Sequence, residues 1–331
     1  MKLTFAIHIK KDQWRKFFDQ NQYATSFQSP EYFDFFNSIP GFFAEIFTVN
    51  EQEEIKALCV VTRQNETGIK GYFSRRAIIY GGPLLSRDHP SDLVHLLERI
   101  ENYYRRKAIY IEFRLLNDYN SYDRVFRSRK WNYLPYLNYR VDCTDAKKVY
   151  RNLSSNRKRQ IKKALRSGVQ IKEAETPEEV KTFYVILKEL YQKKIRKPLP
   201  PGEFFIEFFQ RKLGKIFLVT FENRIIGGIV CPLLKERCIY EYYVCGLDEQ
   251  YRNQSPSVMA TWAAMQYATE NNIPVFDFMG AGRKDRDYGV REFKSRFGGE
   301  LVEYGRYIKI IHPLLYQIGK TGLSFMKLFS R

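Results

Sequence analysis

The sequence predicts a mixed α/β (α+β) protein of two domains, each with a mostly antiparallel sheet flanked by helices. Three observations lead to this fold class. The chain has 331 residues, enough for two hydrophobic cores. Apolar runs typical of strands alternate with longer runs of helical spacing. Late in the chain, three strand-like runs are separated only by short turns, which favours antiparallel pairing.

The composition is globular and strongly basic. Hydrophobic residues make up 44% of the chain, and the formal net charge is +18. Such an excess points to anionic partners: nucleic acid, phosphorylated substrates or an anionic membrane surface. The five cysteines form no CxxC pair and have apolar neighbours, so buried thiols in a reducing compartment are expected. The four histidines are too dispersed to predict a metal site.

The first half of the chain has the pattern of an α/β domain. Ser29 and Pro30 are typical of an N-cap followed by Pro at the first helical position, which predicts a helix over 31–38. Glu112 and Arg114 alternate on one expected strand, but the sequence offers them no third partner. The expected strands are 42–49, 55–62, 71–80, 108–115 and 133–141, with a polar turn at 65–68 and a helix at 93–105.

The domain boundaries are placed from these elements. We expect an N-terminal domain at 1–150, a C-terminal domain with a basic cleft at 151–311, and a basic, apolar tail helix at 312–331. The order of elements in the first domain is a rougher version of the order in the second, so a structural duplication is possible.

A strongly basic segment begins the second domain. Residues 151–166 contain seven Lys or Arg and no acid, and Ser155 is a candidate N-cap for a helix over 156–167. Its functional interpretation is a clamp for phosphates at a domain junction. The alternative is a solvated surface helix. The residues expected to contact an anionic substrate here are Arg157, Lys158, Lys162 and Lys163, with Arg166 on the same cationic stripe.

The middle of the second domain is predicted with clear boundaries. Thr176 caps a long helix over 176–196, with Glu178 and Glu179 near the positive end of its dipole. The further elements expected are a helix at 203–213, strands at 215–221, 224–233 and 237–246, and a helix at 257–271.

The stretch 275–304 organises the predicted site. A short buried strand at 275–279 leads into Gly280 and Gly282, which allow a sharp turn and close approach of another molecule. A short helix follows, with Asp287 as its candidate N-cap and Gly298 past its end, and then a strand over 300–311. Val290, Phe293 and Phe297 have the spacing of a buried face, with Arg291, Lys294 and Arg296 beside or away from it. Arg283, Tyr288 and Arg291 complete the expected substrate contacts.

Several motifs, taken in order, resemble the Fem family of non-ribosomal peptidyl transferases and related proteins with a GNAT-like fold. The second half carries SSNRKRQIKKALRSGV at 154–169, FDFMGAG at 276–282 and YGVREFKSRFGGELVEYG at 288–305, and the first half carries QSPEY at 28–32 and YGGP at 80–83. The resemblance implies two GNAT-like domains. It also implies transfer of an aminoacyl group from aminoacyl-tRNA to an amine of a peptidoglycan precursor or another anionic envelope acceptor. The FK pair of the FKxxF pattern is tied to catalysis in that family, which implies catalytic roles for Phe293 and Lys294. No cofactor is implied.

The chemistry of such a transfer is modest. The protein must align the amine with the carbonyl and stabilise the developing oxyanion. Lys294 is a candidate fixed positive charge for the oxyanion or for the leaving ribose oxygen; the alternative is a surface lysine. No proton acceptor is evident, although Asp277, Asp285 and Asp287 are nearby. We therefore expect one cationic groove, floored by the glycine turn, in the carboxyl half.

Two other functions are open. The first is a CoA-dependent GNAT N-acyltransferase of envelope polysaccharide or lipid biosynthesis. Such enzymes cradle pyrophosphate on backbone N–H groups of a Gly-rich loop, whereas the corresponding loop here, 251–257, has no glycine and contains Pro256. The second is a non-catalytic binder of RNA or anionic lipid, supported by charge alone.

The location of the protein is predicted from its apolar runs. The N-terminal run is too short for a signal peptide, and no run approaches the roughly 18 apolar residues of a spanning helix. A cytoplasmic protein is expected, with peripheral contact between 312–331 and an anionic membrane as one possibility. The alternative for this tail is docking onto the protein's own core.

Overall fold

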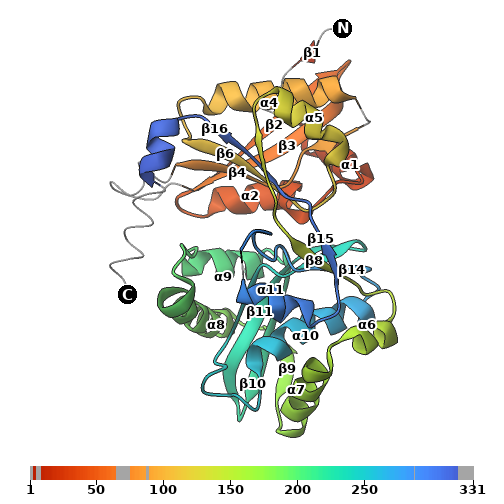
Figure 1. Ribbon diagram of the computed structural model, residues 1–331, viewed down its shortest axis with the longest axis vertical. Coiled ribbons are helices and arrows are strands. Elements are labelled where there is room, and N and C mark those ends of the chain that lie inside the picture. Colours follow the sequence, from red (N-terminus) through yellow and green to blue (C-terminus); the bar gives the residue numbers. More distant parts are fainter. Residues whose placement is uncertain (1–2, 5–8, 65–74, 87–88, 287, 320–331) are drawn as a thin grey trace. The chain divides into compact units, whose positions relative to one another are not determined.

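The chain, seen here in a computed structural model, forms two compact units (Figure 1). The structure describes residues 3–4, 9–64, 75–86, 89–286 and 288–319. Unit 1 comprises 1–135 and 304–331, and unit 2 comprises 136–303. Each unit has one mixed sheet flanked by helices, which confirms the predicted fold class.

Unit 1 contains the first part of the chain and one strand from its end. Its elements are β1 (Leu3–Thr4), α1 (Lys11–Gln20), η1 (Ser26–Gln28), α2 (Pro30–Ser38), β2 (Phe42–Glu51), β3 (Glu54–Gln64), β4 (Arg76–Gly81), β5 (Leu84–Leu85), α4 (Pro90–Tyr104), β6 (Tyr110–Leu115), η2 (Asn120–Tyr122), α5 (Asp123–Ser128), β7 (Asn132–Leu134) and β16 (Arg306–Ile310).

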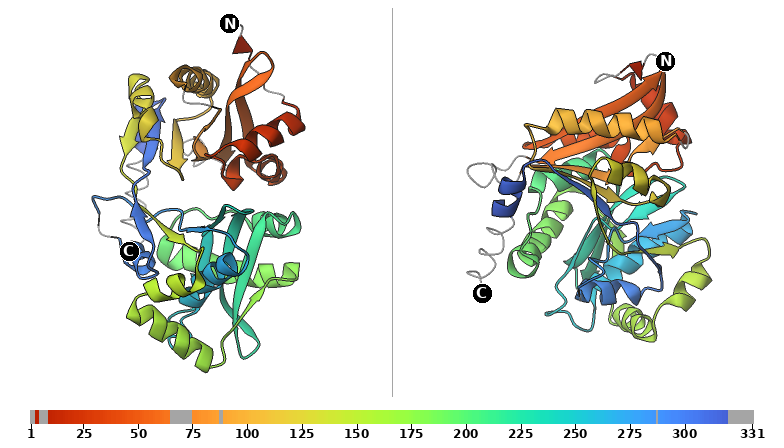
Figure 2. Two further views of the ribbon diagram at one scale, coloured as in Figure 1. Left: turned by 90° about the vertical axis from the view of Figure 1, so that its right-hand side faces the viewer. Right: turned by 45° about the horizontal axis from the view of Figure 1, so that its top comes forward.

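The sheet of unit 1 has the strand order β1-β2-β3-β4-β6-β16-β7, with β5 paired to β3. Among the described strands of this sheet, only β4 and β6 pair in parallel. The amphipathic helix α4 packs along β2 and β3 (Figure 2) and buries Leu93, Leu97 and Ile100 in the core. The predicted cap of α2 is confirmed, because the Ser29 side chain accepts a hydrogen bond from the Tyr32 N–H.

Glu112 of β6 has the partners that the sequence did not offer. Arg114 donates to Glu112 Oε2 at 3.0 and 3.1 Å, and Arg306 of β16 donates to Oε1 at 2.7 Å. Arg114 also donates to the Tyr80 hydroxyl at 3.1 Å. Burial alone raises the pKa of Glu112, but the two guanidinium groups outweigh it and lower that pKa to about 2.

This carboxylate predicts acid sensitivity of unit 1. The pKa of Glu112 is lower in the folded chain than its ordinary value of 4.5. The ion pairs therefore contribute fully above about pH 4.5 and are lost as the pH falls toward 2, at a cost of roughly 3 kcal/mol in unfolding free energy. Urea unfolding from pH 6 to pH 3 checks this in a Trp262→Phe variant, whose remaining tryptophans, Trp14 and Trp131, lie in unit 1. Adding Glu112→Gln to this variant should make the unfolding free energy depend less on pH. An unchanged pH dependence would contradict the assignment of the acid sensitivity to Glu112.

Unit 2 contains the continuous middle of the chain. Its elements are β8 (Asn138–Asp142), α6 (Ala146–Asn152), α7 (Ser155–Arg166), β9 (Gln170–Glu173), α8 (Pro177–Leu190), the π-helical turn η3 (Tyr191–Ile195), α9 (Gly202–Gln210), β10 (Gly214–Phe221), β11 (Arg224–Leu234), β12 (Cys238–Tyr240), β13 (Tyr243–Gly246), α10 (Pro256–Glu270), β14 (Val275–Asp277), α11 (Gly289–Ser295) and β15 (Glu300–Val302).

The sheet of unit 2 has the order β15-β8-β14-β12-β11-β10-β9, with β13 paired to β11. Helices cover both of its faces. A Cβ added at Gly227 would meet Pro256 of α10, whereas one added at Gly228 would meet Phe183 of α8. Because successive residues of a strand face opposite sides, α8 and α10 lie on opposite faces of β11. The predicted cap of α8 is confirmed as a capping box between Thr176 and Glu179.

The two sheets repeat one topology. From β2 to β7, and from β10 to β15 along the strand order, the pairings are antiparallel, antiparallel, parallel, antiparallel and antiparallel. The helix α4 precedes β6 as α10 precedes β14. The structural duplication suggested by the element order is therefore present in the strand pairing.

The structure divides the chain differently from the predicted boundaries at 150 and 311. The strand β8 pairs with β14 and β15 and so belongs to unit 2, and β16 pairs with β6 and β7 and so belongs to unit 1. Each sheet therefore contains a strand that comes, along the chain, directly after a strand of the other unit's sheet: β8 after β7, and β16 after β15. Local sequence does not reveal this exchange, because the partner strands are far apart along the chain.

Three predicted strands are wrong as continuous elements. The strand expected at 133–141 is broken at Pro135 into β7 and β8, and that expected at 237–246 is broken at 241–242 into β12 and β13. The strand expected at 300–311 is broken at Gly305, whose φ is 72°, and its two parts, β15 and β16, pair in different sheets. The long helix ends earlier than predicted, at Leu190, before the π-helical turn.

All five cysteines are buried, and burial raises the pKa of each thiol.

None of the helices that the structure describes has the length and apolar character needed to cross a membrane. Within the described ranges, no group of three or more His, Cys, Asp or Glu is arranged to hold a metal ion. Residues 313–319 are helical, and the rest of the predicted tail helix and the predicted turn at 65–68 lie outside the described residues.

Candidate active site

The predicted helix after the glycine turn is α11, and its buried face differs from the prediction. Tyr288 is at the N-cap position, and the predicted cap, Asp287, lies outside the described residues. Phe297 is fully buried against Phe278, as expected, but Val290 is 40% exposed. Lys294 takes the inward position instead, with only 8% of its surface exposed.

The Lys294 ammonium has three acceptors, one for each of its N–H donors. It donates to the Phe278 carbonyl oxygen at 2.6 Å and to the Gly280 carbonyl oxygen at 2.9 Å. Its third contact is an ion pair with Glu241 Oε1 at 2.9 Å. The alternative interpretation of Lys294 as a surface lysine is therefore wrong.

The turn that Lys294 holds is strained. The strain lies at Met279, whose φ of 54° is in the left-handed region that non-glycine residues avoid; Gly280 and Gly282, with φ values of 125° and 83°, adopt positive φ without strain. Strain of this kind costs about 1–3 kcal/mol per residue and persists only where the surroundings fix it, most often at functional sites.

Hydrogen bonds from neighbouring strands fix this turn. The Asp277 carboxylate accepts from the Met279 N–H at 2.7 Å, and the Asn138 side chain accepts from the Gly280 N–H at 2.7 Å. The Ala281 N–H donates to the Leu137 carbonyl at 2.6 Å. Since these three N–H groups are occupied, the turn does not offer them to a substrate.

The two glycines have different roles. A Cβ at Gly282 would overlap the Tyr288 ring at 2.6 Å, so Gly282 is needed for internal packing. A Cβ at Gly280 would meet only the Leu137 carbonyl oxygen, at 4.0 Å. Gly280 is thus the glycine beside open space, where another molecule can approach the backbone.

The other predicted contacts of this stretch brace the turn. Arg291 donates to the Ala281 carbonyl at 3.0 Å and to the Arg283 carbonyl. The Arg283 side chain forms an ion pair with Asp285 at 2.6 Å. Arg291 is therefore engaged with the protein's own backbone, and Asp285 is occupied by a cation.

Asp277 is the buried acid of the site. It accepts from the Asn138 amide at 2.8 Å, and its other oxygen lies 3.5 Å from Arg140 Nε. Burial raises the pKa of Asp277, while Asn138, the Met279 N–H and the charges of Arg140 and Lys294 act against that rise. A carboxylate so enclosed fixes the turn and is not exposed to a substrate amine.

The sequence predicted that Arg157 lies on the exposed stripe of the basic helix, but the structure buries it. It is 3% exposed, and its guanidinium lies 4.3 Å from the centre of the Phe293 ring and 4.8 Å from that of Phe297. It donates to the Phe293 carbonyl at 3.1 Å, and burial lowers its pKa to about 10. Arg157 thus attaches α7 to α11, and the prediction that it binds substrate directly is wrong.

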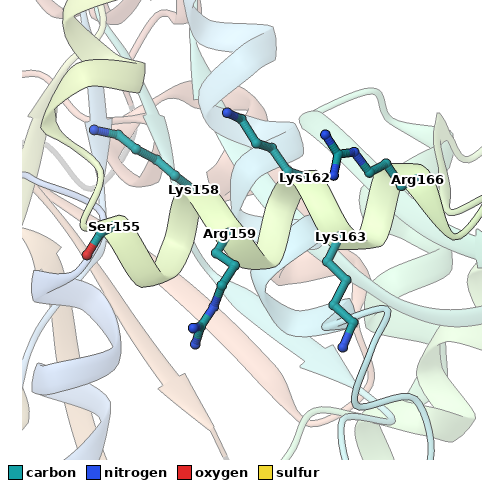
Figure 3. A pocket seen from close by; sticks show the side chains of 6 residues that line it. All are labelled: Ser155, Lys158, Arg159, Lys162, Lys163 and Arg166. Carbon is teal, nitrogen blue, oxygen red and sulfur yellow. The ribbon is translucent and has the colours of Figure 1, made fainter.

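The exposed face of α7 keeps the remaining cations. Its N-cap is Ser154 rather than the predicted Ser155. A hollow of about 460 Å³ lies along this face. Figure 3 shows Lys158, Lys162 and Arg166 projecting to one side of the helix, with Arg159 and Lys163 projecting to the other. Lys294 does not line this hollow, so the single cationic groove expected from the sequence is replaced by a buried lysine site and a separate basic surface.

Sequence reasoning missed Glu241 and Asn138, which anchor Lys294 and the turn. Glu241 directly follows the apolar strand β12, and an acid inside an otherwise apolar strand region was the one signal that could have found it. Asn138 gives no such signal, because it lies far from the turn along the chain.

The N-terminus of α10 is the place where a CoA-dependent enzyme would hold pyrophosphate. Here the Asp248 carboxylate occupies it. Asp248 accepts from the Ser257 N–H at 3.2 Å and from the Ser257 hydroxyl. A fixed negative charge at this helix end disfavours a phosphate ligand.

Comparisons with known proteins agree with this architecture. Residues 151–295 match the family model of the acetyltransferase (GNAT) domain. Aminoacyltransferase FemA of Staphylococcus epidermidis is 32% identical over 85 residues, which is 24% of this chain and 20% of that protein. The alignment therefore spans about a fifth of the length of this curated relative.

Solved structures show the same fold over nearly the whole chain. The crystal structure of FemX superposes with a TM-score of 0.72 at 14% identity, covering 96% of this chain and 99% of FemX. A tandem GNAT protein from the clavulanic acid biosynthesis pathway superposes with a TM-score of 0.61 at 8% identity, covering 94% of this chain and 99% of that protein.

The fold and the site thus define a protein of two GNAT-like domains in tandem. Within this class the chain is similar in fold to FemX and, over 85 residues, similar in sequence to FemA.

Proposed function

We propose that this protein is an acyltransferase that moves an aminoacyl group from aminoacyl-tRNA to an amine of a peptidoglycan precursor or a related envelope acceptor. The amine nitrogen attacks the ester carbonyl carbon, the C–O bond to the ribose breaks, and the leaving ribose oxygen takes a proton from solvent. The amine's proton passes to solvent or to a substrate phosphate. The reaction needs no cofactor.

The observation that carries this proposal is the environment of Lys294. A lysine that is buried, ion-paired and bound to the carbonyls of a strained turn is costly to maintain, and such arrangements are concentrated at functional sites. Its ammonium supplies the positive charge that a tetrahedral oxyanion needs. Phe293 packs on Arg157 and Phe297 and holds α11 in place.

The exposed cations of α7 supply the surface for the tRNA. Five Lys or Arg line one hollow on this helix, and no acid lies between 151 and 166. A surface of this kind binds a phosphate backbone without reading its sequence. In this role the protein acts in the cytoplasm, and residues 312–331 are proposed to contact the inner face of an anionic membrane.

A comparison of donors and acceptors tests the proposal. The full chain is incubated with radiolabelled aminoacyl-tRNA or with acetyl-CoA, each with and without a lipid-linked or nucleotide-linked peptidoglycan precursor. We expect label to move only from aminoacyl-tRNA and only when the acceptor amine is present. Transfer from acetyl-CoA would support the alternative N-acyltransferase, and RNA binding without any transfer would support the non-catalytic alternative.

Asp248 gives a separate prediction about the donor. We expect no acetyl-CoA binding below about 1 mM, because a carboxylate about 4 Å from a bound phosphate repels it by about 1–4 kcal/mol. Isothermal titration calorimetry checks this. Asp248→Asn, which removes the charge and keeps the shape, should bind acetyl-CoA more tightly than the native chain. Micromolar binding to the native chain would contradict the prediction.

A further inference from the structure

Glu241 lies at the point where the unit 2 sheet divides. Glu241 follows β12 and precedes β13 along the chain, and both of these strands pair with β11. The Glu241 N–H donates to the Asp277 carbonyl at 2.8 Å, and the Tyr242 N–H donates to the Val230 carbonyl at 3.0 Å. Its backbone is therefore held from both neighbouring strands.

The side chain of Glu241 connects two helices. One oxygen pairs with Lys294 of α11 at 2.9 Å, and the other accepts from the Thr261 hydroxyl of α10 at 3.2 Å. Glu241 is 5% exposed. A buried carboxylate that accepts from both sides has little freedom to move, so it fixes the position of the ammonium it pairs with.

The three acceptors of Lys294 differ in how readily a substrate could replace them. Glu241 carries the only negative charge among them, and the bond to the Phe278 carbonyl is buried. The bond to the Gly280 carbonyl is only partly buried, and Gly280 is the residue with open space at its Cβ position. The Gly280 carbonyl is thus the acceptor that an incoming oxygen can displace.

From this geometry we infer that Glu241 is a positioning residue for acyl transfer. It holds the Lys294 ammonium in a fixed position, so that the substrate's carbonyl oxygen takes the place of the Gly280 carbonyl as the third acceptor. The Thr261 hydroxyl fixes the second oxygen of Glu241. This inference rests on the proposed acyltransferase function.

The test compares Glu241→Gln, Glu241→Asp and Thr261→Val in the transfer assay with the full chain. Glu241→Gln keeps the shape and loses the charge, and we expect kcat to fall about 10- to 100-fold with the KM for both substrates within about twofold of the native value, since the charge acts in the transition state. Glu241→Asp keeps the charge on a shorter side chain and should recover part of kcat. Thr261→Val is the matched control, because it keeps the carboxylate and removes the hydroxyl behind it, which also lies 3.3 Å from the Ser257 carbonyl oxygen, and its kcat should fall less than that of Glu241→Gln.

Two results would overturn the inference. One is a native kcat in Glu241→Gln. The other is a loss of kcat that follows the loss of folded protein in all three variants, with no recovery in Glu241→Asp. An activity-independent measurement separates this inference from the proposed function: urea unfolding of Glu241→Gln, Lys294→Met and the double variant. If the effects of the two substitutions on the unfolding free energy are not additive but the native chain shows no transfer, the ion pair between Glu241 and Lys294 is confirmed and the proposed acyltransferase function is rejected. Native transfer without coupling would reject the role of Glu241 alone.

Discussion

Lys294→Met is expected to abolish transfer and to destabilise unit 2. Removing the ammonium leaves Glu241 buried without its counter-charge. Breaking a buried ion pair from one side costs about 3–5 kcal/mol. Urea unfolding and the transfer assay measure the two effects separately.

A second substitution separates catalysis from stability. In Lys294→Met with Glu241→Gln neither charge remains, so the unfolding free energy should recover by most of the amount lost in the single variant. Transfer should remain absent, because the oxyanion still lacks its cation. If the stabilised double variant regained native activity, Lys294 would be a structural residue and the catalytic assignment would be wrong.

Charge reversal on α7 should have the second large effect. Lys158, Lys162 and Lys163 all line the hollow on the exposed face of this helix. Replacing all three with Glu removes about three phosphate contacts, so the slope of log affinity against log salt should fall in magnitude by about three. We expect tRNA affinity near 0.1 M salt to fall by about 100-fold or more. Filter binding from about 0.05 to 0.3 M salt measures both quantities.

A matched control has the same change in net charge. Lys188 of α8 and Lys212 and Lys235, which lie in turns, are exposed lysines elsewhere in unit 2. Their triple replacement by Glu should weaken binding only through the long-range field, with a nearly native salt slope. Equal losses in the two triple variants would show that total charge, and not the surface of α7, determines RNA binding.

Much of the fold was predictable because its signals are local. The Ser29–Pro30 start of α2 and the Thr176 cap of α8 involve residues within one helical turn, and both were predicted and confirmed. The strands that were wrongly joined, at Pro135 and Gly305, belong to different sheets on either side of the break. Local pattern favours one long strand there, and only pairing with distant strands divides it.

The candidate site was predicted in part for the same reason. The FKxxF pattern and the glycine turn are contiguous, and they indicated the right segment. The same spacing placed Val290 on the buried face and Lys294 beside or away from it, whereas in the structure Val290 is exposed and Lys294 is buried. The acceptors that draw Lys294 inward come from the turn and from Glu241, and the seven residues of α11 are too few for helical periodicity to decide between faces.

By itself, the sequence of this protein determined the fold class, the basic helix and the segment that carries the lysine, because periodicity, caps and charge runs act over a few residues. The tertiary structure alone decided which cations are buried and which are exposed. Arg157 and Lys294 face inward because aromatic rings, a carboxylate and backbone carbonyls from other segments compensate their charges there. Lys162 and Lys163 of the same basic helix remain exposed at the surface. Burying a charge is favourable only where partners are already assembled, and assembling them requires the fold.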